Sequence, residues 1–246
     1  MNIENMILVG FAFALGGILK GATGAGTPLL AVPIVALLYD VPTAVALLIF
    51  PNIASNAVQL WQNRSEPVNR YFLYTFAGAS ALGAAIGTVA LAKISGDALL
   101  LYVAIVVLFF VAFRLLRPTW RLSPKAANRL VLPIGCLAGG LQGAVGISGP
   151  VSISFLNALR LERPKFVLII SLSFIAIALV QLPMQVHFGI MTWERAQLSV
   201  LALVPMGVGM PIGSAIGRRF SAKTFDRIIL FILFTLSVKM IFEFLF

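Results

Sequence analysis

Long apolar segments alternate with short polar segments along the whole chain, five in each half. In the first half they cover about residues 6–19, 28–39, 42–62, 71–92 and 98–116. In the second half they cover about residues 131–141, 150–160, 164–186, 196–217 and 224–245. A helix of roughly 20 apolar residues crosses the hydrocarbon core of a bilayer, so the pattern predicts an all-α integral membrane protein.

The composition supports this prediction and excludes a soluble domain. The 246 residues are 60% hydrophobic, with a mean hydropathy of +1.03, 18 Lys and Arg residues and 8 Asp and Glu residues. So few charges do not cover the surface of a soluble protein. No polar segment is long enough to fold alone, so we expect one structural unit. The first 19 residues lack the basic start of a signal peptide, and the single cysteine, Cys136, allows no intrachain disulfide.

A glycine-rich break interrupts the apolar pattern once in each half. The first is Lys20-Gly-Ala-Thr-Gly-Ala-Gly-Thr-Pro28, and the second, offset by 122 residues, is Gln142-Gly-Ala-Val-Gly-Ile-Ser-Gly-Pro150. The same offset relates Gly21 to Gly143, Gly24 to Gly146, Pro42 to Pro164 and Gln59 to Gln181, and an offset of 126 relates Gly83 to Gly209 and Gly87 to Gly213. We therefore predict two membrane repeats, residues 1–122 and 123–246, with a binding site between the two breaks.

The first two apolar segments of each half, about 11–14 residues each, flank the break and are short for a core of about 30 Å. Each pair forms either one broken spanning helix or a re-entrant hairpin. With hairpins, 14 of the 18 Lys and Arg residues fall in cytoplasmic loops, as the positive-inside rule requires. These loops are 64–70, 114–129, 160–165 and 218–227. The rule favours inverted-topology repeats, each with a hairpin and three spanning helices, and both termini outside. Counting each hairpin as one span gives about eight spans.

Each break ends in a helix start signal, Gly26-Thr27-Pro28 or Ser148-Gly149-Pro150. The first N–H groups of a helix lack internal partners and carry the positive end of the helix dipole. Irregular backbone at membrane depth survives only where it is buried or lines a cavity. We therefore predict that two helix N-termini meet near the midplane and bind an anion. Thr23, Thr27 and Ser148 add hydroxyl donors.

Lys20 stands at the first break, where its counterpart in the second is the neutral Gln142. Lys20 either supplies positive charge to the anion site or lines a water-filled rim. Further polar residues lie inside the third span of each half: Asn52, Ser55, Asn56 and Gln59, then Ser171, Ser173, Gln181 and Gln185. These residues either contact the ligand or make hydrogen bonds between helices. Pro51 is expected to kink its helix and free carbonyls toward the site.

The sequence offers no machinery for metal binding or catalysis. All eight acidic residues lie at or near segment ends, and the one histidine, His187, ends a span. We find no His/Cys/Asp cluster, no serine–histidine pair at a plausible spacing and no phosphate-binding loop. We therefore expect no cofactor, no metal and no enzyme activity. The net charge of +10 does not indicate nucleic-acid binding, since the basic residues stand between apolar runs.

At these residues the chain resembles the sulfite exporter TauE/SafE family, also called the four-toluene sulfonate uptake permease family. The motif Gly16-Gly17-x-x-x-Gly21-x-x-Gly24-x-Gly26-x-Pro28 and its second copy, Gly139-Gly140-x-x-Gly143-x-x-Gly146-x-Ser148-Gly149-Pro150, carry the resemblance. It implies a bacterial inner-membrane protein of eight spans that handles sulfur-containing anions. It also implies an anion cradle made of Gly24, Gly26, Thr27, Gly146, Ser148 and Gly149. Many relatives have a run of glycines where this chain has Thr27, which alters the shape of the pocket.

The functional hypothesis is a secondary transporter, and more specifically an exporter, for a small sulfur-containing anion such as sulfite or an organosulfonate. The chain lacks an ATP-binding motif, and a membrane potential favours anion export by about 2.3 kcal/mol per charge per 100 mV. Its expected partners are the anion and membrane lipid, with a second copy of the chain compatible with the pattern. One alternative is transport of another small organic anion, such as a carboxylate. Another is a membrane scaffold or sensor that transports nothing.

Overall fold

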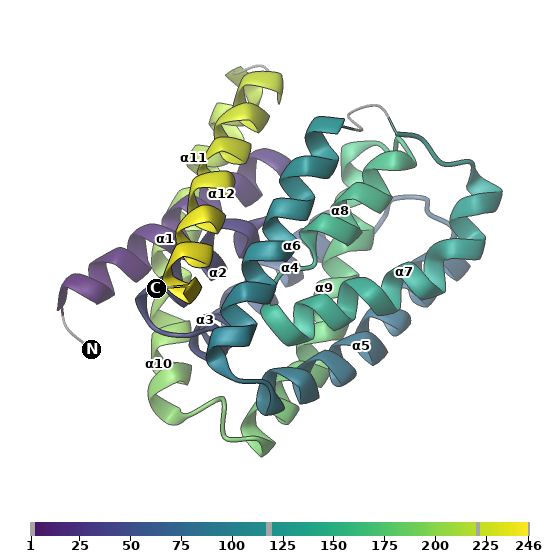
Figure 1. Ribbon diagram of the computed structural model, residues 1–246. Coiled ribbons are helices and arrows are strands. Elements are labelled where there is room, and N and C mark those ends of the chain that lie inside the picture. The colour runs from purple at the N-terminus through teal and green to yellow at the C-terminus, as the bar shows by residue number, and fades with distance from the viewer. Residues whose placement is uncertain (1–2, 117–119, 220–221, 246) are drawn as a thin grey trace.

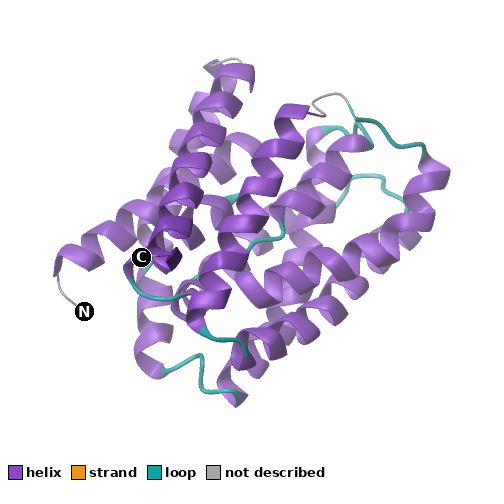
Figure 2. Ribbon diagram, viewed as in Figure 1, coloured by secondary structure: helices purple, strands orange, loops and turns teal. Residues whose placement is uncertain are grey.

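The computed structural model describes residues 3–116, 120–219 and 222–245, and all regular structure within them is helical (Figure 2). Seven helical segments of this part are long and apolar enough to cross a membrane. The prediction of an all-α, multi-pass membrane protein is therefore confirmed. Arg117 and the side chains of Arg218, Arg219, Lys223 and Asp226 lie outside the described part.

Twelve helices are assigned in the described residues (Figure 1). Those of the first half are α1 (Ile3–Thr23), α2 (Thr27–Leu38), α3 (Val41–Leu47), α4 (Ile49–Asn63), α5 (Arg70–Lys93) and α6 (Gly96–Leu116). Those of the second half are α7 (Pro124–Val145), α8 (Gly149–Ala158), α9 (Arg163–His187), α10 (Trp193–Leu201), α11 (Leu203–Arg219) and α12 (Ala222–Leu245).

Helices α1 and α7 are longer than the apolar pattern predicts. They contain 21 and 22 residues, about 30 Å at a rise of 1.5 Å per residue. Helix α1 is among the seven segments long and apolar enough to cross a membrane, so the expectation that the segment before the first break is too short is wrong, whereas α7 is not among them. The apolar pattern underestimates both helices because α1 continues through Lys20 and α7 begins with polar residues, including Lys125 and Arg129.

Two spans are interrupted by one non-helical residue, at Leu48 between α3 and α4 and at Ala202 between α10 and α11. The first interruption lies three residues before Pro51, which has no N–H to donate to the carbonyl of Leu47. That carbonyl instead accepts the Ser199 hydroxyl at 2.8 Å. The carbonyl freed by Pro51 is thus paired with α10, and the expectation that it turns toward the binding site is wrong.

Glycines hold the two most extensive helix contacts, α5 with α7 and α1 with α11. A methyl group added at Gly83 would lie 2.0 Å from the Cys136 carbonyl oxygen, and one at Gly209 would lie 2.3 Å from that of Ala14. Real side chains cannot come so close, so these glycines let the helices cross in contact. The structure thus agrees with a packing role for the Gly83/Gly87 and Gly209/Gly213 pairs.

The same offsets that relate the two halves in sequence also relate these contacts. Gly83 and Cys136 exchange with Gly209 and Ala14 when the halves are exchanged. Further contacts of this kind join Gly87 to Gly140 and Gly213 to Ile18, Gly139 to Ser80 and Gly17 to Met206, and Gly143 to Ala84 and Gly21 to Met210. The glycines at the ends of α1 and α7 therefore pack against the opposite half, a role that the sequence pattern did not reveal.

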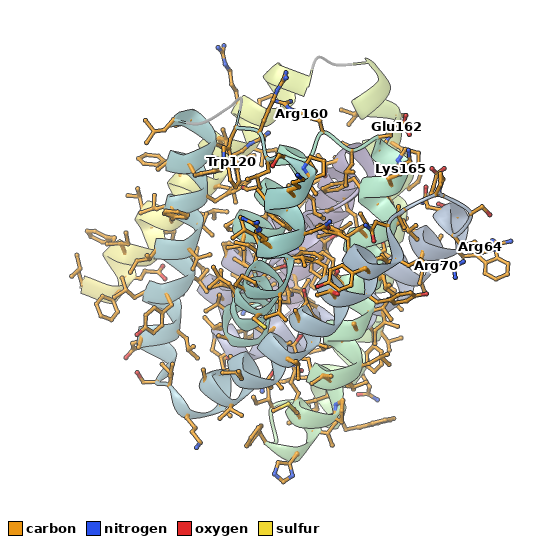
Figure 3. The ribbon with its side chains drawn as sticks, turned by 90° about the vertical axis from the view of Figure 1, so that its right-hand side faces the viewer. Arg64, Arg70, Trp120, Arg160, Glu162 and Lys165 are labelled. Atoms are coloured by element: carbon orange, nitrogen blue, oxygen red, sulfur yellow. The ribbon has the colours of Figure 1, made fainter. Side chains whose placement is uncertain are left out.

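The loops of the chain gather at two ends of the molecule. The Leu122 N–H donates to the Ala158 carbonyl at 2.9 Å, so α7 and α8 form a hairpin that returns to its starting end. One hollow at this end is lined by Val68, Leu122 and Leu161, one residue from each of three basic loops. Figure 3 shows Trp120, Arg160 and Lys165 at the top of the molecule, with Arg64 and Arg70 at the right.

The opposite end carries the loops before α3 and α10. Asp40, which caps α3 through the Thr43 N–H at 2.6 Å, lies 3.8 Å from the Arg195 guanidinium. In the first half, α2 folds back along α1, since the Thr27 hydroxyl donates to the Gly16 carbonyl at 3.2 Å. Both breaks are therefore tips of helical hairpins, and neither is a kink within one spanning helix.

Candidate functional site

The second break ends α7 at Gly146, whose φ is +72°, and α8 begins at Gly149. The side chains of Gln142 and Ser148 are 2% and 1% exposed. The Gln142 Oε1 accepts the Ser148 N–H at 3.1 Å and the Ser148 hydroxyl at 2.9 Å. An amide oxygen thus occupies the N-terminus of α8, where an anion would find the same donors.

The first break has the same backbone design in apolar surroundings. Gly24 and Gly26 have φ values of +90° and +114°, which side-chain-bearing residues rarely adopt. A methyl group added at Gly24 would lie 2.7 Å from the Val167 side chain. Thr27 donates its hydroxyl to α1, and its Oγ1 lies 3.8 Å from the Met206 sulfur. The exposed Thr23 donates its hydroxyl to the carbonyls of its own turn.

Each break lies beside the first turns of a spanning helix from the opposite half. Gly24 lies beside Val167, the fifth residue of α9. A methyl group added at Gly146 would lie 3.0 Å from the side chain of Val45, the fifth residue of α3. Each tip therefore stops about one helical turn inside the end of a spanning helix. The expected position of both breaks near the midplane stays a prediction.

The N-terminal turns of α2 and α8 pass each other side by side. A methyl group added at Gly149 would lie 3.1 Å from Leu29, and one at Gly146 would lie 3.0 Å from Val32. Residue numbers thus rise along α2 while those of its neighbours in the second break fall. The two helices α2 and α8 are therefore antiparallel. The two helix N-termini are buried, and their first turns lie side by side.

Lys20 lies in the interior and points away from its own break. It is 2% exposed, and its Nζ donates to the Asn56 Oδ1 at 2.7 Å. The Nζ also lies 5.8 Å from the centroid of the Phe174 ring. Such burial does not fit a lysine that lines a water-filled rim. Within the described residues Lys20 has no acidic partner.

The other predicted polar residues of the third spans are all buried, and most of them bond between helices or within their own helix. Asn56 donates its amide to the Asn52 carbonyl at 2.8 Å. Gln59 accepts the Ser171 hydroxyl at 3.3 Å, which joins α4 to α9. Gln181 lies 3.4 Å from the Gln142 carbonyl and joins α9 to α7. These contacts form a polar framework around Lys20 and Gln142.

A narrow void lies between α5, α7, α8 and α9. It is closed too tightly to hold a water molecule. Its lining consists of Phe76, Ser80, Ala138, Ser148, Ser152, Ile170, Ser173, Phe174 and Ile177. Ser80 is 1% exposed, and its Oγ has no hydrogen-bond partner. Sequence reasoning missed Ser80 and Ser152, because a serine among small residues of a helix gives the same signal as plain helix packing.

Two larger hollows open at the basic end and share Arg114 and Asn157. One of them continues past Thr23, Ala25 and Leu29, which places the first break beside it. The described residues contain no group of three or more His, Cys, Asp or Glu side chains that could hold a metal ion. The site therefore consists of one lysine, amides, hydroxyls and helix N-termini, which are donors suited to an anion.

Comparison with known proteins gives a family for the chain. No curated protein and no solved structure matches it. The model of one family, described as "Sulfite exporter TauE/SafE", matches residues 8–240, which is nearly the whole chain. The glycine motifs, the buried donors and the multi-pass helical fold all lie within that match, and the chain belongs to the sulfite exporter TauE/SafE family.

Proposed function

We propose that this protein is a secondary transporter that exports a small sulfur-containing anion, such as sulfite or an organosulfonate, across a bacterial inner membrane. Membership of the sulfite exporter family supports membrane transport of sulfur anions as the general activity. The observation that supports an anionic substrate for this chain is the burial of Lys20. Its neighbours are an amide oxygen and an aromatic ring, and it has no described acidic partner. An uncompensated buried cation costs several kcal/mol. A bound anion would remove that cost.

The substrate is held where the Lys20–Asn56 pair approaches the Gln142–Ser148 pair. Phe174 supports this position, because its ring lies near the Lys20 ammonium and also lines the void beside Ser148. The backbone at Gly24, Gly26, Thr27, Gly146 and Gly149 shapes the hairpin tips. Asn52, Gln59 and Gln181 orient this cluster, and Thr23 stands at the cytoplasmic side of the first tip.

Transport proceeds by alternating access of two inverted repeats, residues 1–122 and 123–246. The reciprocal glycine contacts support a two-fold relation between them. The placement of the three described basic loops at one end supports opposite orientations of the halves. The tightly crossed α5–α7 and α1–α11 pairs each join a helix of one repeat to a helix of the other. The membrane potential supplies about 2.3 kcal/mol per 100 mV for each negative charge moved outward.

Flux measurements in proteoliposomes test this function. Vesicles containing the purified protein are preloaded with labelled sulfite or a two-carbon sulfonate, and efflux is followed with and without an imposed potential. We expect saturable efflux that an inside-negative potential accelerates. Empty vesicles and vesicles with the Lys20→Met protein are the controls. Absence of saturable flux for every sulfur anion would contradict the proposal. Faster flux of a matched carboxylate would change the substrate class.

A further inference from the structure

We propose that the serine-lined void between α5, α7, α8 and α9 is the chamber that holds the anionic head of the substrate while both faces of the protein are closed. This inference rests on the proposed transport function and names its substrate position and class. The chamber lies near the middle of the spanning helices, since Ser173 and Ser80 occupy central turns of α9 and α5.

Hydroxyl groups from three helices converge on the void. Ser80 comes from α5, Ser148 from the residue that precedes α8, Ser152 from the first turn of α8, and Ser173 from α9. Ser152 and Ser173 donate to carbonyls of their own helix turns, at 2.9 and 3.0 Å. Ser80 has no partner at all, and it is 1% exposed. A buried hydroxyl without a partner lowers stability, so its presence indicates a ligand that completes the site.

The electrostatics of the void favour a negative ligand. Ser148 precedes the first turn of α8, where the helix dipole places partial positive charge. The Lys20 ammonium lies on the far side of Phe174, 5.8 Å from the ring centroid. No acidic residue lines the void. An oxyanion in this position would receive hydroxyl hydrogen bonds and lie near the Lys20 side chain.

The remaining lining restricts what can be attached to the oxyanion. It is made of Phe76, Phe174, Ala138, Ile170 and Ile177. This apolar wall accepts a short uncharged substituent. A second charge has no partner there, and an ammonium group would also be repelled by Lys20. The chamber therefore selects the singly charged hydrogen sulfite ion or a short alkyl sulfonate over an aminoalkyl sulfonate or a dianion.

Phe174 closes the chamber on the side of Lys20. Its ring lines the void and is 4% exposed, and the void is too narrow for water as it stands. An arriving anion has to displace this ring. The displacement brings the Lys20 Nζ within reach of the anion, so charge recognition and chamber opening occur together. Phe174 is thus a positioning residue that couples Lys20 to the serines.

Binding measurements on the purified full-length protein in detergent test the chamber. Calorimetry gives the Kd for sulfite, ethanesulfonate and 2-aminoethanesulfonate, and thermal unfolding gives the Tm without ligand. We compare the wild type with Ser80→Ala, Ser80→Thr and Ser173→Ala. Ser237→Ala is the matched control, because Ser237 is equally buried on α12 but donates to the Leu233 carbonyl at 2.8 Å, away from the void.

We expect Ser80→Ala to weaken sulfite binding about tenfold while its ligand-free Tm stays equal to or above that of the wild type. Ser80→Thr retains most of the affinity, and Ser237→Ala leaves the Kd unchanged. Wild-type affinity is expected to be at least tenfold lower for 2-aminoethanesulfonate than for ethanesulfonate. If Ser80→Ala does not fold, a weakened Kd in Ser173→Ala carries the same conclusion.

The outcomes separate the chamber from the proposed function. If the wild type binds and transports sulfite but the serine variants bind it with unchanged Kd, the chamber is overturned and the transport proposal stands. A lowered ligand-free Tm with unchanged Kd would assign Ser80 a structural role and also overturn the chamber. If the wild type neither binds nor transports any sulfur anion, both proposals fail.

Discussion

At the first break Lys20 turns away from its own hairpin tip and bonds Asn56 on α4, whereas at the second break the equivalent Gln142 turns back and caps α8 through Ser148. The surrounding backbone is alike in both. Each tip has a glycine with positive φ before a helix that starts with proline. Each tip also stops beside the fifth residue of a helix in the opposite half. One residue at matching positions therefore gives the two tips different chemistry.

The donor and acceptor groups of the two side chains explain this difference. The N-terminus of a helix presents N–H donors and needs an acceptor. The Gln142 amide has an acceptor oxygen and meets that need at Ser148. A lysine ammonium has only donors, so Lys20 cannot cap α2 and bonds an amide oxygen on another helix. The comparison indicates that the second tip is satisfied within the protein, while the charge of Lys20 is left for a ligand.

The largest effect should come from chemical access to the two tips. In a Cys136→Ser background, Thr23→Cys is expected to react with a membrane-impermeant thiol reagent in inside-out vesicles and to be protected in right-side-out vesicles. The reason is that Thr23 is exposed beside the hollow at the basic end. Val145→Cys, next to the second tip and buried, is the control. Labelling of Thr23→Cys from the outside would reverse the assigned orientation.

Lys20→Met should abolish most anion transport without unfolding the protein. We expect flux to fall about 100-fold, because the substrate loses its charge-assisted contact. The Tm should stay equal or rise, since an apolar side chain of similar length removes the cost of a buried charge. Flux assays and thermal unfolding of the same preparation measure both quantities. Equal flux in Lys20→Met and wild type would remove the basis of the proposed anion site.

Gly26→Val should damage the first tip more than Gly149→Val damages the second. At Gly26 a valine meets a φ of +114° and the Leu19 side chain at 3.1 Å, which should cost about 3 kcal/mol of unfolding free energy. Gly149 has no positive φ, and its neighbours Leu29 and Ile153 are side chains that can shift, so about 1 kcal/mol is expected. Denaturant unfolding in detergent measures the difference. Equal losses would show that the two tips are equally strained.

Gln142→Leu should destabilise the second tip and make it depend on the anion. Its loss leaves the Ser148 N–H and hydroxyl buried without an acceptor, which should cost about 2 kcal/mol. Sulfite should then raise the Tm of this variant more than that of the wild type, because the anion replaces the lost acceptor. Gln59→Leu, which loses an amide elsewhere in the framework, is the control. The same sulfite-dependent rise in both variants would argue against an anion at the α8 N-terminus.

Thr27→Val should have the smallest effect. The Thr27 hydroxyl donates to the Gly16 carbonyl at 3.2 Å, so its removal should cost about 1 kcal/mol of stability. Its sulfite Kd should change less than that of Ser148→Ala, whose hydroxyl lines the void. Calorimetry on the two variants makes the comparison. A larger loss of affinity in Thr27→Val would move the anion toward the first tip.

Several features of the fold follow from the sequence because they depend on short-range properties. Hydrophobic length gives the membrane helices, and glycine followed by proline locates the two breaks. The spacing of Gly83 and Gly87 predicts close helix packing. The structure agrees, because the Cys136 carbonyl lies too close to Gly83 for any side chain to fit. The distribution of positive charge also predicts which loops lie on the same side of the membrane. The hydrogen bond of Leu122 with Ala158 agrees with this prediction for the loops 114–129 and 160–165.

Other features depend on which helices meet, and only the tertiary structure decided them. The partner of Lys20, the antiparallel contact of the two hairpin tips and the gathering of Ser80, Ser152 and Ser173 around one void all join residues far apart in the chain. Local backbone preference and periodicity carry no information about such pairs. The direction of a long side chain such as Lys20 is set by the acceptor that packing brings within reach, and that acceptor, Asn56, is 36 residues away.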